Sequence, residues 1–425
     1  MILLKHLGWR VALALSVLSL ALYSCSPDIS LIRVAPPKQR AVLSVWLWPG
    51  SGLETMIKQY AEEQSGVDVD IVISQYDDVL PGLMSSLATR SKAPDLVLLD
   101  ASQLGEMKRY REQFYNLYDF GDERTRFLEW KWRLAENRDG AFLFAMPADI
   151  GPVALAYRRD LFEAAGLPAE RDAVSEAFPD WDALESAGLQ LKEKTGAALF
   201  DNMNNVFQSY FNQFDGQYLG SRTGRLSPRV KEAWDRAVRF QQLGLIAGLP
   251  SQTTEWADGA VNGRFAAVLA PSWLHGMLKK NAPATRGLWD LAKAPGLPSG
   301  WKGSFLAIPK TSGQPREAYA LASWLTTPQR QLATFRSNGN FPSTPTVYST
   351  RDFLDVRDPF FNDAPTGQIY AYAALRLNYA YGHSADSSVE SLLREGLRRV
   401  EKGEARPEQA WRDVEKRIQQ IDKGE

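Results

Sequence analysis

The sequence predicts an α/β protein whose first part is built on a parallel β-sheet. Apolar runs alternate with amphipathic helical patterns between residues 41 and 100, in the order strand, helix, strand, helix, strand. This order gives parallel strands joined by right-handed crossovers. The first run, AVLSVWLW at 41–48, is almost entirely apolar, as in a strand that is buried on both faces. The composition is 44% hydrophobic and 23% charged, which is typical of a globular protein.

The elements that follow the first strand in this part are a helix at 53–66, a strand at 67–74, a helix at 77–90 and a strand at 95–100. The helix at 53–66 places its apolar residues on one face. Ser51 is a candidate N-cap for this helix, and Gly66 is a candidate residue for its C-terminal end. In open parallel sheets, ligands bind beyond the carboxyl ends of the strands. Those ends carry Trp46, Trp48 and Asp100.

A second unit follows, with a more irregular order of elements. Residues 140–168 predict a strand, an irregular Pro-Gly-Pro stretch, a second strand and a short helix. Further helices are predicted at 180–196, 205–214, 230–245, 317–335, 387–403 and 407–421, and further strands at 197–201, 263–273 and 301–313. A length of 425 residues suggests at least two domains.

The N-terminus has the pattern of an export signal. Lys5 and Arg10 precede an apolar run of about 13 residues, which is shorter than the about 20 that a membrane-spanning helix needs. We predict a signal peptide at 1–25 and a polar tether at 26–40. Cys25 is the only cysteine, so this chain forms no internal disulfide. The folded body is therefore expected outside the cytoplasm, held by its core alone.

Several segments, taken in order, resemble the extracellular solute-binding proteins of ABC importers, in the bacterial sugar-binding family (family 1). They are PADIGPVALAYRRDLFEAAGLP, DWDAL, AVLAPSW, FLAIPKTSGQPREAYALASWLTTPQRQ and GNFPSTPTVY. The likeness spans about 40 to 420. Separately, LYSC resembles a bacterial lipobox, which implies that Cys25 becomes the first mature residue and carries lipid. An uncleaved N-terminal anchor is the alternative.

The resemblance implies a periplasmic-binding-protein-like fold, with two α/β lobes joined by hinge strands and a ligand cleft between them. Such lobes close around the ligand by hinge motion. The predicted division is 41–149 plus 302–350 for the first lobe, 152–298 plus 355–425 for the second, and crossings near 148–152, 296–302 and 351–359.

Sugar recognition guides the choice of candidate site residues. Aromatic side chains cover the apolar face of a sugar ring, and planar polar groups meet its hydroxyls. The predicted ligand-binding residues are Trp48, Asp100, Asp149, Asn202, Asn205, Trp273, Trp301 and Lys302, and weaker candidates are Trp46, Asn204, Gln208 and Phe341. Each has a structural alternative, because tryptophan also fills cores, and Asp and Asn also cap helices or form turns.

The function predicted is a lipid-anchored receptor that binds a carbohydrate or similar polar solute and delivers it to an ABC permease. No nucleophile elbow, zinc-binding or Walker motif is found, and a formal net charge of -1 gives no sign of a nucleic-acid partner. We therefore expect no enzyme activity and no metal or other cofactor. A glycoside-acting enzyme and a ligand receptor for a membrane sensor remain alternatives.

Overall fold

The computed structural model describes residues 40–64, 66–89, 91, 93–220, 225–377, 379, 383 and 385–422. The predicted signal peptide, Cys25 and all of the tether except Arg40 lie outside the described residues.

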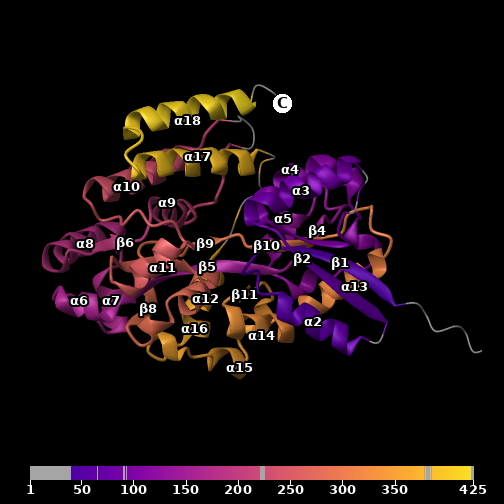
Figure 1. Ribbon diagram of the computed structural model, residues 1–425, viewed down its shortest axis with the longest axis horizontal. Helices are drawn as coiled ribbons and strands as arrows, with labels where there is room; N and C mark the ends of the chain where they lie inside the picture. The colour runs from indigo at the N-terminus through magenta and orange to yellow at the C-terminus, as the bar shows by residue number, and fades with distance from the viewer. Residues whose placement is uncertain are drawn as a thin grey trace, which may run out of the picture. The chain divides into compact units, whose positions relative to one another are not determined.

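The first lobe is built on a five-stranded sheet, shown in Figure 1. Its strands, in spatial order, are β2 (Val67–Ile73), β1 (Ala41–Leu47), β3 (Leu96–Asp100), β10 (Ser304–Ala307) and β4 (Ala145–Pro147). β1 pairs in parallel with both β2 and β3, which confirms the predicted alternation of strands and helices. β10 inserts between β3 and β4 and is antiparallel to both. The associated helices are α2 (Glu54–Glu63), α3 (Tyr76–Thr89), α4 (Ala101–Met107), α5 (Glu129–Ala135) and α13 (Pro315–Leu325).

The second lobe is built around the long strand β5 (Asp149–Arg158). Its other strands are β6 (Ala198–Phe200), β7 (Phe265–Pro271), β8 (Trp289–Lys293), β9 (Gly300–Trp301) and β11 (Phe341–Pro342). Its helices are α6 (Arg159–Ala164), α7 (Arg171–Ala177), α8 (Trp181–Thr195), α9 (Met203–Phe211), α10 (Pro228–Gln242), α11 (Thr254–Val261), α12 (Ser272–Asn281), α14 (Pro328–Asn338), α15 (Arg351–Leu354), α16 (Thr366–Ala374), α17 (Asp386–Glu401) and α18 (Pro407–Asp422). Short 3-10 turns occupy Lys108–Gln113, Leu117–Asp119, Arg124–Arg126, Pro283–Thr285, Pro345–Val347 and Pro359–Phe361.

Local signals set several of these boundaries. Asp180 caps α8, because its carboxylate accepts hydrogen bonds from two backbone N–H groups of the first turn. The same helix ends at Gly196, which has a φ of 74° and takes up the left-handed conformation that glycine adopts at little cost.

The predicted irregular stretch around Pro152 is wrong, because β5 runs through it without a break. The partner of β5 changes along its length: Asp149 and Ile150 pair with β11, Gly151 and Pro152 with β9, and the later residues with β7 and β8. A proline, which lacks the N–H donor, is tolerated in a strand where pairing changes.

Three further predicted elements differ in the structure. The strand predicted at 301–313 is split into β9 and β10 at Gly303, whose φ of 73° and close approach to the Asp149 carbonyl leave no room for a side chain. The helix predicted at 317–335 is two helices, because Pro328 starts a new one and biases Thr327 to extended backbone. The strand predicted at 263–273 ends at Pro271, so that Trp273 lies in the first turn of α12.

The chain passes between the two sheets at Ala148, between β4 and β5, and at Lys302–Gly303, between β9 and β10. β11 already pairs with the start of β5 at Phe341, ahead of the third crossing predicted near 351–359. The exact lobe boundaries therefore remain a prediction.

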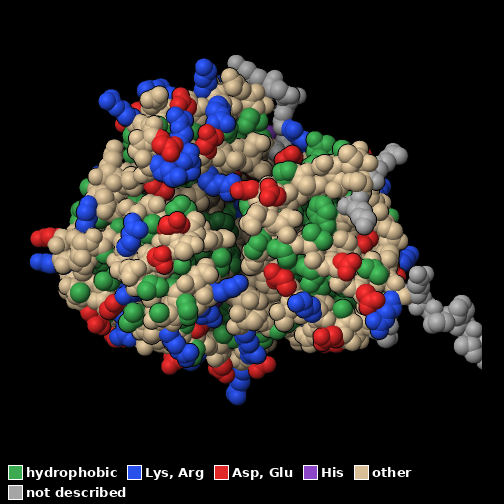
Figure 2. All heavy atoms as spheres, viewed as in Figure 1, with side chains coloured by type: hydrophobic (Ala, Val, Ile, Leu, Met, Phe, Trp, Pro, Cys, Tyr) green, Lys and Arg blue, Asp and Glu red, His purple; other side chains and the backbone are tan. Residues whose placement is uncertain are grey.

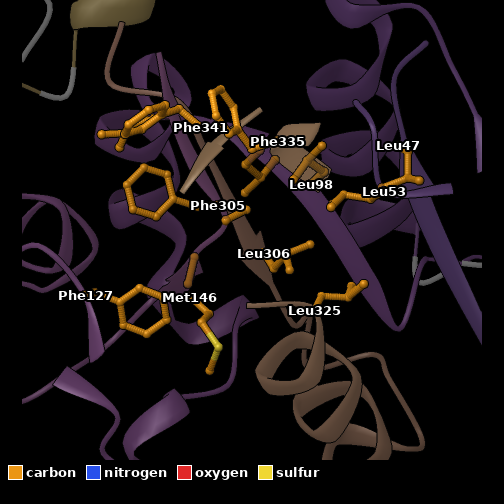
Figure 3. Packing of buried hydrophobic residues seen from close by; sticks show 14 of the residues in the cluster. Leu47, Leu53, Leu98, Phe127, Met146, Phe305, Leu306, Leu325, Phe335 and Phe341 are labelled. Atoms are coloured by element: carbon orange, nitrogen blue, oxygen red, sulfur yellow. The ribbon is translucent and has the colours of Figure 1, made fainter. Parts of the chain in front are cut away.

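Two apolar cores hold the lobes. One continuous cluster joins the first sheet to α14 and β11, and Figure 3 shows Leu98, Phe305 and Leu306 of the sheet beside Phe335 and Phe341. A second cluster packs α8, α9, α10 and α17 on β5, β6 and β7. Each fully buried large apolar side chain contributes about 1.5–3 kcal/mol. The first cluster also includes Ile150 and Ala154 of β5 and Phe265 of β7, so it continues from the first sheet into the second.

Candidate functional site

A groove separates the two lobes on the face shown in Figure 2. Comparison with the ribbon places it between the side of α3 and α5 and the side of α9, with β9 and β10 beneath, and α17 contacts α4 across it. Side chains from both lobes come close to one another here.

On the first-lobe side, the groove is built at the carboxyl ends of β1 and β3. Trp48 follows β1 and packs edge-on against Tyr76, with ring centroids 5.4 Å apart. Asp100 ends β3 and caps α4, accepting from Ser102 N at 2.8 Å and Ser102 Oγ at 2.6 Å. Burial, followed by the charges of Asp100 and Glu390, raises the pKa of Tyr76 well above its usual value. The predicted position beyond the strand ends therefore holds an aromatic pair and a carboxylate.

On the second-lobe side, α17 presents Glu390 and Arg394. Burial is the main cause that raises the pKa of Glu390 to about 7, and the negative charge of Asp100 adds to it, while Arg394 and Lys302 oppose it. Tyr218 Oη donates to Glu390 Oε2 at 3.3 Å. Charges from separate lobes are thus close enough to act on one another, and we call Tyr76, Asp100, Lys302, Glu390 and Arg394 the cleft cluster.

Lys302 lies in the strand connection beneath the groove. Its Nζ donates to the Gly216 carbonyl at 3.0 Å and lies 5.6 Å from the centroid of the Tyr379 ring. Trp130 of α5 packs edge-on against the same ring at 5.1 Å. Trp130 Nε1 is buried and has no hydrogen-bond partner among the residues that the structure describes. This region therefore combines a cation, two aromatic faces and an unpaired N–H donor.

Trp273 and Trp301, two of the predicted stacking residues, lie together. Their rings are 6.5 Å apart and nearly perpendicular, at 89°. Both are partly buried and stand over Gly151, where an added Cβ would lie 3.1 Å from Trp301 Cβ and 3.3 Å from Trp273 Nε1. The absence of a side chain at Gly151 allows the two indoles to approach β5.

The carboxylate of Asp149 is used inside the protein. It accepts from Ser304 N at 2.7 Å, from Ser304 Oγ at 2.6 Å and from Asn340 Nδ2 at 2.7 Å. Nearby, Lys131 Nζ donates to the carbonyls of Lys302 and Ser304, and burial lowers its pKa to about 7. These bonds hold the crossing segments together.

The predicted asparagines are buried in the second lobe. Asn202 caps α9 by accepting from Asn205 N at 2.9 Å, and Asn205 Nδ2 donates to Asp201 at 2.8 Å. Ser251 and Trp256 complete this group of polar side chains around Asp201. We call these five residues the Asp201 network. Because these amides have internal partners, we do not carry them into the proposed site.

The weaker candidates also have structural surroundings. Gln208 bonds to Tyr218 Oη at 3.0 Å, and Phe341 is fully buried in the core. Trp46 is partly buried and lies near Gly82 of α3, while Asn204 is partly exposed in the first turn of α9.

Sequence reasoning missed Tyr76, Trp130, Tyr218, Glu390 and Arg394. One signal was available: Glu390 and Arg394 are four residues apart and so lie on one face of a helix. Tyr76, Trp130 and Tyr218 carry no local signal that separates them from core aromatics.

The described part of the chain contains no group of three His, Cys, Asp or Glu side chains placed to hold a metal ion. No helix within it has the length and apolar character to cross a membrane.

Comparison with known proteins identifies the family. The family model of the bacterial extracellular solute-binding proteins matches residues 55–363. A solved extracellular solute-binding protein of family 1 is 31% identical, with a TM-score of 0.78, over 89% of this chain and 99% of its own. The chain belongs to the bacterial extracellular solute-binding proteins. A comparison with curated protein sequences gives no match.

More distant structures share the fold of this solute-binding protein. A binding protein from B. animalis subsp. lactis Bl-04, solved with β-1,6-galactobiose, has 18% identity and a TM-score of 0.77 over 89% of this chain and 97% of its own. The GacH receptor of Streptomyces glaucescens, solved unliganded and with acarbose, has 16% identity and a TM-score of 0.72 over 90% and 98%. The predicted two-lobe α/β fold and the predicted family are confirmed.

Proposed function

We propose that this solute-binding protein binds a carbohydrate, most readily an oligosaccharide, between its lobes and delivers it to an ABC permease. The structurally similar proteins solved with β-1,6-galactobiose and with acarbose support the ligand class. The observation that carries the proposal is the cleft cluster, in which charged side chains of both lobes lie close enough to act on one another, beside the half-buried rings of Trp48 and Tyr76.

The chemistry of the groove suits sugar hydroxyls. The carboxylates of Asp100 and Glu390 accept hydrogen bonds, Lys302 and Trp130 Nε1 donate, and each hydroxyl both donates and accepts. Aromatic faces at Trp48, and at Trp273 and Trp301 as predicted from sequence, would cover the apolar side of a ring. A hydrogen bond to a charged group contributes about 1.5–3 kcal/mol, so three or four such contacts account for micromolar binding, about 8 kcal/mol.

A thermal-shift screen over neutral mono- and oligosaccharides, polyols and polar non-sugar solutes tests the ligand class. A true ligand at 100 times its Kd stabilises the folded protein by about 2.7 kcal/mol. Saturable stabilisation by a saccharide is the expected result. Stabilisation only by a non-sugar solute would contradict the carbohydrate assignment and leave the family unaffected.

Two carboxylates near one sugar are also the arrangement that a glycosidase uses to hydrolyse its substrate. We propose that the ligand leaves unchanged. Chromatography of the ligand after long incubation with the protein should recover all of it, and hydrolysis that disappears in the Glu390→Gln variant would contradict this.

We further propose that Cys25 carries lipid and anchors the protein outside the cytoplasm. The support is its position after the apolar run and the order LYSC. Intact mass of the mature protein should show a lipid-modified Cys25 at the new N-terminus, and Cys25→Ser should release or mis-process the protein. An unmodified Cys25 with Met1 still attached would contradict the anchor.

A further inference from the structure

A small cavity lies at the junction of the crossing segments. Its polar lining includes Ser51 from the loop after β1, Asp149 at the start of β5, Ser304 of β10, Asn340 before β11 and Gln331 of α14, and the rest of its wall is Leu53, Ala148, Leu325 and Thr334. These residues come from five separate segments of the chain. The cavity is about large enough for one water molecule.

Two polar atoms on the wall of this cavity lack a partner. Ser51 Oγ and Asn340 Oδ1 are buried and make no hydrogen bond with any residue that the structure describes, and the two residues are only 4% and 7% exposed. A buried polar group that is left unpaired destabilises the folded state. Other polar groups on the wall are satisfied, since Gln331 donates to Ser343 Oγ and the Ala148 carbonyl.

The unused hydrogen-bond donors and acceptors on the cavity wall match those of one water molecule. The Ser51 hydroxyl donates one proton, which a water oxygen accepts. Asn340 Oδ1 is an acceptor, and Asp149 Oδ2 accepts only from Asn340 Nδ2 and keeps one lone pair. A water that accepts once and donates twice makes the three hydrogen bonds typical of buried water.

We propose that this cavity is a binding site for one ordered water molecule that joins Ser51, Asn340 and Asp149. The water ties the loop after β1 to the same carboxylate that already holds Ser304 and Asn340. Asn338 Nδ2 reinforces the link by donating to the Gly52 carbonyl at 3.1 Å. The inference does not depend on which solute the groove binds.

The consequence concerns the hinge. Asp149 is a positioning residue that fixes three segments at the point where the chain passes between sheets, and the water adds the loop after β1 to this bonding.

A crystal structure at a resolution that shows ordered solvent tests the site directly. The expected result is a fully occupied water within hydrogen-bond distance of Ser51 Oγ, Asn340 Oδ1 and Asp149 Oδ2. In solution, the Asn340 side-chain amide should show nuclear Overhauser effects to a long-lived water. Ser51→Ala should abolish the effect and lower Tm by roughly 2 °C, while Ser388→Ala, on the exposed face of α17, leaves both unchanged.

Several outcomes would overturn the proposal. They are density with no water, a direct hydrogen bond between Ser51 and Asn340, a solute group in the cavity, or a water that persists unchanged in Ser51→Ala. If Ser51→Ala does not fold, the wild-type density and the wild-type Overhauser effect still decide the question.

Discussion

The cleft cluster and the Asp201 network contain similar side chains but find their partners in different places. Asp201 accepts from Asn202 N, Asn205 Nδ2 and Trp256 Nε1 at 2.8, 2.8 and 2.9 Å, all within the second lobe. Asp100 and Glu390 instead belong to different lobes, and the negative charge of Asp100 adds to the burial that raises the pKa of Glu390.

The two clusters differ in whether their hydrogen-bond partners lie within one lobe or across two. A network that is satisfied within one lobe stabilises that lobe and has little capacity left for a ligand. A cluster that brings like charges from two lobes together gains hydrogen bonds when a ligand binds between the lobes and they close. Since a ligand shifts an open–closed equilibrium only by its differential affinity, the second arrangement is the one suited to driving closure.

The largest expected effect is on the Asp201 network. Asp201→Ala removes the acceptor of four hydrogen bonds and should lower the free energy of unfolding by about 3 kcal/mol or more. Chemical denaturation measures it, with Asp258→Ala, an exposed carboxylate of α11, as the control. The ligand affinity of the folded fraction should not change, and a selective loss of affinity would place this network in the binding site.

The next effect is on affinity. Glu390→Gln and Lys302→Met should each weaken binding about 10- to 100-fold, the equivalent of about 1.5–3 kcal/mol, because each removes a charged partner of the ligand. Isothermal titration measures the change. Glu395→Gln, one turn away on α17 and paired with Arg417 at 2.8 Å, is the matched control. Equal losses in Glu395→Gln and Glu390→Gln would argue against a specific cleft role.

A smaller effect concerns pH. Because the folded-state pKa of Glu390 is raised from 4.5 to about 7, the folded protein binds a proton more tightly than the unfolded chain. This contribution to stability is complete below about pH 4.5 and is lost as pH rises through 7. Glu390→Gln should therefore flatten the fall in unfolding free energy between these values. An unchanged slope would show that Glu390 titrates normally.

The smallest effect is expected at the rim of the groove. Arg394 Nη2 lies 3.3 Å from Asp77 Oδ1 of the first lobe, with side chains 44% and 76% exposed. Exposed pairs contribute about 0.2–1 kcal/mol and are screened by salt. Asp77→Asn should slightly favour the open form in small-angle scattering at low salt, with no difference at high salt. A large effect at high salt would mean that the pair is a principal determinant of closure.

The alternation of β1, α2, β2, α3 and β3 could be predicted from the sequence, because the spacing of apolar residues within each short segment indicates a strand or a helix. The sequence also determined the cap of α8 at Asp180, which depends on neighbours two and three residues away. Trp48, Asp100 and Lys302 were predicted for the same reason, since the end of a buried strand and an ordered set of motifs are local features.

The partners of the polar candidates depend on the tertiary fold. Asn205 and Asp100 looked equivalent as candidates, yet Asn205 is buried against Asp201, while Asp100 lies opposite a helix that begins at Asp386. The insertion of β10 between β3 and β4 is equally non-local. The physical reason is that the partners of a polar side chain come from segments that lie hundreds of residues away in the sequence.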